Sequence, residues 1–129
     1  MNAPAVDECE PARDRAREGK ANNTRGKAWM RDVARYLREW FPGIDVIADN
    51  RRADLSGLTE WAMECKSMQT DRWPETMRQV QRDQLARGAR WHVVFKKSYG
   101  QPARMGLAVM SIQQWAEIAV ILDHLEAKL

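Results

Sequence analysis

Ala53-Asp54-Leu55-Ser56-Gly57 is followed, ten residues after Asp54, by Glu64-Cys65-Lys66 in an apolar run that favours a strand. Side chains alternate between the two faces of a strand, so Glu64 and Lys66 share one face and Cys65 points to the other. Two carboxylates that converge at Asp54 and Glu64 can hold Mg²⁺ or Mn²⁺, because these ions prefer oxygen ligands. A lysine two residues beyond the second ligand can orient a water molecule or stabilise charge on a phosphate. The spacing therefore predicts a metal-dependent site for phosphodiester cleavage.

Each of these three residues also has a simpler interpretation. Asp54 precedes Ser56-Gly57, and aspartate is common in turns. Glu64 can be neutralised by a salt bridge to Lys66 alone, since a buried carboxylate needs a cation. Lys66 can be an exposed charge at the end of a strand. The joint occurrence of the three residues favours the metal site.

Length and composition indicate a small globular domain. The 129 residues are 44% hydrophobic and 30% charged, which allows one core. No apolar run approaches the roughly 18 residues that a membrane-spanning helix needs, and the N-terminus has no apolar stretch typical of a secretory signal. The two cysteines, Cys9 and Cys65, predict neither a disulfide framework nor a structural zinc site. We expect a protein of a reducing cytoplasm, in a bacterium or a phage-infected host cell, without a membrane partner.

Basic residues are concentrated between residues 72 and 104. This segment has eight basic residues and two acids, Glu75 and Asp83, and so carries a net charge of +6 in a chain whose total is +3. A basic segment beside a metal site suits a polyanionic partner such as nucleic acid. The alternative is a solvated, arginine-rich helix face, and charge alone does not separate the two.

Hydrophobic periodicity predicts helices and strands in the order αβββαββα. The first helix has apolar residues at helical spacing up to Trp40 and ends at Phe41-Pro42-Gly43, and the second ends at Gly88. Ser111 is expected to cap a closing helix. That helix should carry one apolar face, formed by Ile112, Trp115, Ile118, Ala119, Leu122 and Leu125. Strands are expected at residues 44–48, at a short segment beginning with Asp54, and at residues 59–67, 91–96 and 105–110.

This order predicts an α/β fold, with a mixed sheet flanked by helices. Residues 1–22 contain Pro4, Pro11, Gly19 and many charges without an apolar period, and are expected to form a flexible charged tail. Residues 23–129 are expected to form the folded domain.

Four features resemble the PD-(D/E)XK nuclease superfamily: Asp54-x-x-Gly57, Glu64-x-Lys66, a glutamine-bearing helix, and the strand Val93-Val94-Phe95-Lys96. Within it, the chain is most similar to small phage endonucleases and archaeal-type Holliday junction resolvases, whose first helix opens near an Arg-Gly pair, here Arg25-Gly26. The resemblance covers about residues 24–120. It implies a restriction-endonuclease-like fold, a mixed central β-sheet flanked by helices.

The chain departs from the family pattern at two places. Ala53 stands where the superfamily name has proline, at a position that varies in the family. Resolvases of this type carry a glutamate four residues after the glycine, and Met30 stands there. Asp32 or Glu39 are candidate replacements for this first-helix acid, and Asp32 is the nearer.

The resemblance assigns roles to individual residues. Asp54 and Glu64 become metal ligands, with the carbonyl of Cys65 as a third ligand, and Lys66 becomes the catalytic lysine. The Cys65 side chain itself is expected to be packing. A further catalytic glutamine is implied on the second helix. Spacing back from Gly88 favours Gln79, whereas the helical period turns Gln81 and Gln84 toward the sheet.

The residues expected to contact DNA are mostly basic. Lys96 ends a strand where related nucleases place a lysine near substrate phosphate, although it can equally be a solvated strand end. Trp73 can belong to the core or stack on a base. His92 and His124 are expected to be structural and surface residues. The DNA-binding candidates are Arg25, Lys27, Arg72, Trp73, Arg78, Arg82, Lys96 and Lys97.

These observations predict a Mg²⁺- or Mn²⁺-dependent endonuclease that hydrolyses DNA. The resemblance to Holliday junction resolvases implies that it selects branched structures. One active site per chain and the resemblance to resolvases imply a homodimer. The alternative is a catalytically inactive DNA-binding protein that kept the nuclease fold, which Met30 favours. A thiol enzyme acting through Cys65 is disfavoured, because an apolar strand raises the pKa of a thiol.

Overall fold

The computed structural model of the chain describes residues 26–47, 54–67 and 72–129. The predicted order of helices and strands is confirmed, as is the α/β class with a mixed sheet. The tail expected at residues 1–22 lies outside the described residues. The elements are a first helix over residues 26–37, β1 (Asp45–Val46), β2 (Asp54–Ser56), β3 (Trp61–Lys66), α2 (Trp73–Arg87), β4 (Trp91–Lys96), a short 3-10 helix η1 (Ala103–Met105), β5 (Leu107–Val109) and α3 (Ile112–Ala127).

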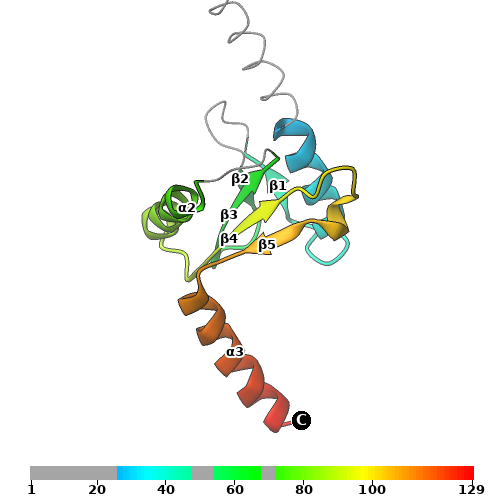
Figure 1. Ribbon diagram of the computed structural model, residues 1–129. Coiled ribbons are helices and arrows are strands. Elements are labelled where there is room, and N and C mark those ends of the chain that lie inside the picture. The colour runs from blue at the N-terminus through cyan, green and yellow to red at the C-terminus, as the bar shows by residue number, and fades with distance from the viewer. Residues whose placement is uncertain (1–25, 48–53, 68–71) are drawn as a thin grey trace, which may run out of the picture.

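The five strands form one open sheet in the order β1-β2-β3-β4-β5 (Figure 1). Strands β3 and β4 are parallel, and the other neighbours are antiparallel. Parallel strands need a long crossover, which α2 supplies between β3 and β4. The carboxyl ends of β3 and β4 therefore lie together, with Lys66 beside Lys96.

One face of the sheet is apolar and is covered by the first helix. Trp29 is buried there, and its indole Nε1 donates a hydrogen bond to the carbonyl oxygen of Phe95 at 2.9 Å. Strand alternation gives this face its composition, because every second residue of β2, β3 and β4 points to it. The buried cluster comprises Trp29, Met30, Val33, Ala34, Ile44, Leu55, Met63, Cys65 and Val93.

The other face is covered by α2 and has a smaller apolar cluster, made of Ala62, Val80 and Val94. The helix ends as predicted at Gly88, whose φ of 66° is the left-handed conformation that glycine adopts most readily. The side chains of Asp54, Glu64 and Lys66 belong to this face, because they alternate with the residues of the apolar one.

Gly57 sets the turn that joins β2 to β3. Its φ is 111°, and a Cβ at this position would collide with the backbone of Gly43 and Ile44. A glycine is therefore required here by both conformation and space. This turn fixes the register in which Asp54 lies directly opposite Glu64.

Helix α3 begins as predicted, with the Ser111 hydroxyl accepting a hydrogen bond from the Gln114 backbone N–H. Its first turn is anchored to β4 through Gln114, whose side-chain amide exchanges two hydrogen bonds with the backbone of His92. Beyond this anchor α3 projects away from the sheet, and its predicted apolar face is largely exposed (Figure 1). Over the described ranges of the chain, no helix has the length and apolar character needed to cross a bilayer.

Candidate active site

Asp54 and Glu64 are paired across β2 and β3 in the middle of the molecule. Residues directly opposite each other in an antiparallel pair place their Cβ atoms on one face, roughly 5 Å apart. Each of these two residues is only 2% exposed. The two carboxylates that the sequence predicts as metal ligands therefore lie next to each other. Both are in the protein interior beneath α2.

Each carboxylate has a cation beside it. The Arg87 guanidinium, from the last turn of α2, donates to Asp54 Oδ2 at 3.1 Å. Lys66 Nζ lies 3.4 Å from Glu64 Oε1. The side chain of Lys66 is 36% exposed, so this lysine connects the buried Glu64 to solvent. The salt bridge that offers a simpler role for Glu64 is thus present, and it is part of the same cluster.

Glu64 is held in an unfavourable environment for its charge. Burial raises the pKa of this carboxyl, and the neighbouring Asp54 and Asp83 carboxylates raise it further, while Lys66 lowers it. Glu64 Oε2 is fully buried and has no hydrogen-bond partner within the part of the chain that the structure describes. A buried, unsatisfied carboxylate oxygen is destabilising, and it is the type of atom that a bound cation would satisfy.

The residues present fit a hard divalent cation. Asp54 and Glu64 are adjacent oxygen donors, one Glu64 oxygen lacks a partner, and the Cys65 backbone lies between Glu64 and Lys66. Within residues 26–47, 54–67 and 72–129, no cluster of three or more Asp, Glu, His or Cys side chains is arranged to hold a metal ion. The side-chain donor set is therefore the carboxylate pair, with backbone and water oxygens left to complete a coordination sphere.

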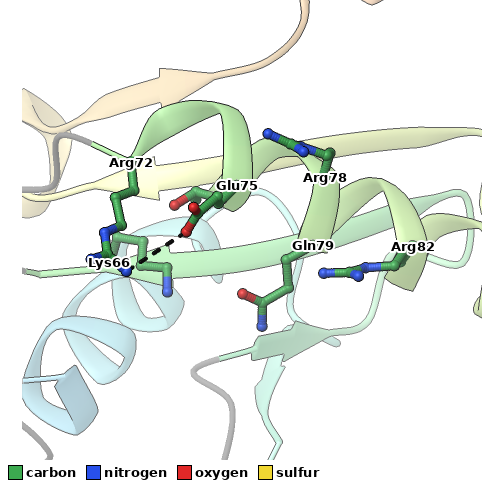
Figure 2. Close-up of a pocket in the computed structure, with 7 residues that line it drawn as sticks. Lys66, Arg72, Glu75, Arg78, Gln79 and Arg82 are labelled. Carbon is green, nitrogen blue, oxygen red and sulfur yellow. Dashed lines mark ion pairs between the residues drawn. The ribbon is translucent and has the colours of Figure 1, made fainter.

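A basic hollow of about 520 Å³ opens between α2 and the end of β3, and it is connected to the carboxylate pair through Lys66, which lines the hollow and pairs with Glu64. Figure 2 shows Lys66, Gln79 and Arg82 extending to the same side of α2 around this hollow. The single acid in its lining, Glu75, pairs with Arg72 at 3.9 Å. A hollow with this charge suits a phosphate group. Its lining consists of Lys66, Arg72, Glu75, Thr76, Arg78, Gln79 and Arg82.

The glutamines of α2 have separate locations. Gln79 lines the hollow together with Lys66. Gln84 turns toward β4, where its amide donates to the Arg90 carbonyl oxygen and its oxygen lies 2.9 Å from His92 Nδ1. Gln81 is half-buried. The geometry therefore favours Gln79 as the glutamine near the candidate site, in agreement with the spacing from Gly88.

Lys96 lies beside Lys66 at the carboxyl end of the parallel pair. It is buried, its Nζ donates to the Lys97 carbonyl oxygen at 2.9 Å, and burial lowers its pKa. Lys96 is thus not the solvated strand end that was the alternative. Lys97 is half-buried in the next position.

Other predicted residues lie apart from the carboxylate pair. Asp32 is exposed on the first helix, which covers the opposite face of the sheet, and Met30 is buried in that face. The Cys65 side chain belongs to the same apolar cluster, and burial raises the pKa of its thiol, as expected for packing. Lys27 is exposed on the first helix, and Arg25 lies outside the described residues.

Trp73 and His92 are packed within the fold, and His124 lies on the surface. Trp73 packs against the apolar cluster beneath α2. His92 is buried and bonded on both ring nitrogens, to Gln84 and to the backbone N–H of Ser111. His124 is exposed on α3, as expected for a surface residue, with its Nδ1 2.8 Å from the Val120 carbonyl oxygen.

Sequence reasoning missed two members of the cluster, Asp83 and Arg87. From the sequence alone, both are only charges within the basic segment of residues 72–104. Asp83 is buried against the sheet, and Arg87 reaches Asp54. The signal was their spacing from Thr76 and Val80: these four residues recur every three or four positions and so share one face of the helix.

The chain matches no protein-family model, and neither the curated proteins nor the solved structures contain a detectable relative. The geometry of the chain itself therefore carries the functional inference.

Proposed function

We propose that this protein is a metal-dependent endonuclease that hydrolyses DNA phosphodiester bonds, with the restriction-endonuclease-like fold and the branched-DNA selectivity of the PD-(D/E)XK resolvases that it resembles. One observation carries the proposal. Two buried carboxylates, Asp54 and Glu64, are in register on one sheet face, and Lys66 links them to a basic hollow.

The proposed division of labour follows from the burial of each group. Asp54 and Glu64 would hold Mg²⁺ or Mn²⁺, which when bound supplies positive charge to the phosphate under attack and to its leaving oxygen. Lys66 is partly exposed and held 3.4 Å from Glu64, so its ammonium can donate a hydrogen bond to the attacking water or to a phosphate oxygen. Gln79, in the same hollow, can orient that water.

The basic residues of α2 would hold the DNA backbone. Arg72, Arg78 and Arg82 surround the hollow and present guanidinium groups, which bind phosphate oxygens in pairs. Contacts of this kind position the nucleic acid without reading its sequence. This suits an enzyme that selects a DNA structure.

The second candidate function is DNA binding without catalysis. Two observations favour it: Arg87 already occupies one oxygen of Asp54, and the first helix contributes no described acid to the cluster. Such a protein would use the same basic hollow and would need no metal ion.

The test is cleavage of a four-way DNA junction and of a plain duplex, with Mg²⁺ or Mn²⁺, by the wild type and by Lys66→Ala. We expect the wild type to nick DNA and the variant to be slower by about 100-fold or more, the scale of losing one group that stabilises transition-state charge. DNA binding by the variant should persist, because three arginines of the hollow remain.

Lys128→Ala is the matched control, since it removes the same charge from the end of α3, outside the hollow. Equal nicking by the wild type and Lys66→Ala would refute the assignment. Binding of DNA without cleavage in either metal would favour the second candidate.

A further inference from the structure

Helix α3 exposes more large apolar side chains than any other element of the described chain. In Figure 1 it extends from the sheet with no described helix or strand packed along it. A contiguous exposed apolar surface of this kind marks an interaction site in a globular protein. The exposed residues are Ile112, Trp115, Val120, Ile121, Leu122 and Leu125, and Leu129 follows the helix.

Five apolar residues of this segment form a continuous seam, which we define as Trp115, Ile118, Leu122, Leu125 and Leu129. Their separations alternate between three and four residues, which is the heptad pattern of a helix that packs against another helix. The opposite side carries three polar residues, Gln113, Glu117 and His124, and one exposed apolar residue, Val120. Helix α3 is therefore amphipathic, with the seam on its apolar side, and is not apolar all round.

We propose that this seam pairs with the seam of a second copy of the chain, so that the protein is a homodimer joined through α3. A heptad seam is complementary to another heptad seam, and two copies related by a two-fold axis cover each other's apolar residues at once. Leu122 is the middle residue of the seam, so it lies at the centre of the contact in both a parallel and an antiparallel pair.

Charge and composition argue against other occupants. Anionic membranes recruit helices with a Lys- and Arg-rich polar face, whereas residues 105–129 contain one basic residue, Lys128, and three acids. The same charges disfavour DNA. Residues 1–22 of the chain are rich in charge and lack an apolar period, so they offer no complementary seam.

The seam is short, which sets the expected strength of the dimer. Standard protein interfaces bury roughly 800 Å² on each partner, and a seam of two heptads is at the low end of that range. We therefore expect a dissociation constant in the micromolar range, with dimer and monomer in measurable exchange. This inference rests on α3 alone and is independent of the nuclease proposal.

Sedimentation equilibrium of the full chain tests the inference, with Leu122→Glu as the disrupting variant. We expect the wild type to approach twice its chain mass of 14.9 kDa at total concentrations well above the expected micromolar dissociation constant. Leu122→Glu should weaken the dimer by at least roughly 100-fold, because each dimer would lose two buried leucines and gain two buried carboxylates.

Val120→Glu is the matched control. Val120 is 56% exposed and Leu122 is 53% exposed, but Val120 lies on the side of α3 opposite the seam. The control should therefore dimerise as the wild type does, and circular dichroism should show folded protein for both variants.

Three results would overturn the inference: a wild type that stays monomeric at these concentrations, a dimer that both substitutions weaken equally, or a dimer that neither weakens. Flotation of a monomeric wild type with anionic vesicles would assign the seam to a membrane and would also overturn it.

Discussion

The two faces of β3 differ completely, although they are built from alternate residues of one strand. Met63 and Cys65 enter an apolar cluster beneath the first helix, whereas Glu64 lies between them on the other face, with Asp54 at its side. Burial of the apolar side chains on the apolar face stabilises the folded state. The charged face buries two carboxylates and leaves one Glu64 oxygen without a hydrogen-bond partner in the described chain.

The two faces of β3 therefore have different roles in stability and in function. The apolar cluster is explained by its contribution to stability. The Glu64 carboxyl, whose pKa is raised by burial, destabilises the folded state when it is ionised. Such groups are concentrated at functional sites, because the chemistry needs them. Substitutions on the two faces should therefore change stability in opposite directions.

The largest effect is expected on the apolar face, from Trp29→Ala. The substitution removes a fully buried indole together with its hydrogen bond to Phe95, and should lower the free energy of unfolding by about 3–5 kcal/mol. Urea unfolding measures this change. Trp40→Ala is the control, because Trp40 is exposed and packs only edge-on against Tyr36 among the described ring contacts, so its loss should be within about 1 kcal/mol. Equal losses would remove the distinction between core and surface.

A smaller effect of opposite sign is expected on the charged face, from Glu64→Gln. The folded-state pKa of Glu64 is raised above its ordinary value of 4.5, so the folded protein binds this proton more tightly than the unfolded chain does. The contribution of Glu64 to stability is therefore full below pH 4.5 and is lost as the pH rises through the raised pKa. At neutral pH the glutamine variant should be more stable, by about 1 kcal/mol, and the advantage should vanish in acid.

Thermal unfolding of both proteins across this pH range measures the difference. Glu75→Gln is the control, because Glu75 is exposed and its pair with Arg72 contributes little. A Glu64→Gln variant less stable than the wild type at neutral pH would show that the charge serves the fold.

The smallest effect is expected at His92, which also lies on the charged face. Its Nε2 accepts a hydrogen bond from the Ser111 N–H, so Nδ1 carries the proton and donates to Gln84. Burial lowers the pKa of His92 below its ordinary value of 6.5, although the contact with Gln114 acts in the opposite direction. The unfolded chain therefore binds this proton more readily, and the contribution of His92 to stability should fall as the pH drops below 6.5, opposite in sign to that of Glu64.

Unfolding midpoints at pH 7.5 and 5.5 measure this slope. His92→Gln should flatten it, and His124→Gln, which removes the exposed histidine of α3, is the matched control. A slope that stays the same in His92→Gln would contradict the assignment of this pH dependence to His92.

Most of the fold could be predicted from local sequence. Strand β4 has the predicted limits, and β3 lies within the predicted range of residues 59–67. Strand β1 is shorter than the predicted range of residues 44–48, because its ladder with β2 pairs only Asp45 and Val46. The Ile47 N–H still donates a hydrogen bond to the Asp54 carbonyl oxygen at 3.0 Å, and residue 48 lies outside the described residues. Alternation along β3 also placed Glu64 and Lys66 on one face correctly, since that periodicity is a property of the strand itself.

What could not be predicted depends on contacts between distant segments. The pairing of Asp54 with Glu64 needs a register that the turn at Gly57 sets against Gly43. The Arg87 contact with Asp54 joins residues 33 positions apart. The exposure of α3 also cannot be predicted from local sequence. An apolar seam has the same period whether it packs against the sheet of its own chain or against another chain.

Calorimetric titration of Mn²⁺ into the wild type and into Glu64→Gln at neutral pH shows whether the buried carboxylates form a metal site. We expect one Mn²⁺ per wild-type chain and binding at least tenfold weaker in the variant, because that substitution removes one of two carboxylate ligands. Absence of Mn²⁺ binding by the wild type, or equal affinity in the two proteins, would refute a metal site at Asp54 and Glu64 and favour a DNA-binding protein without catalysis.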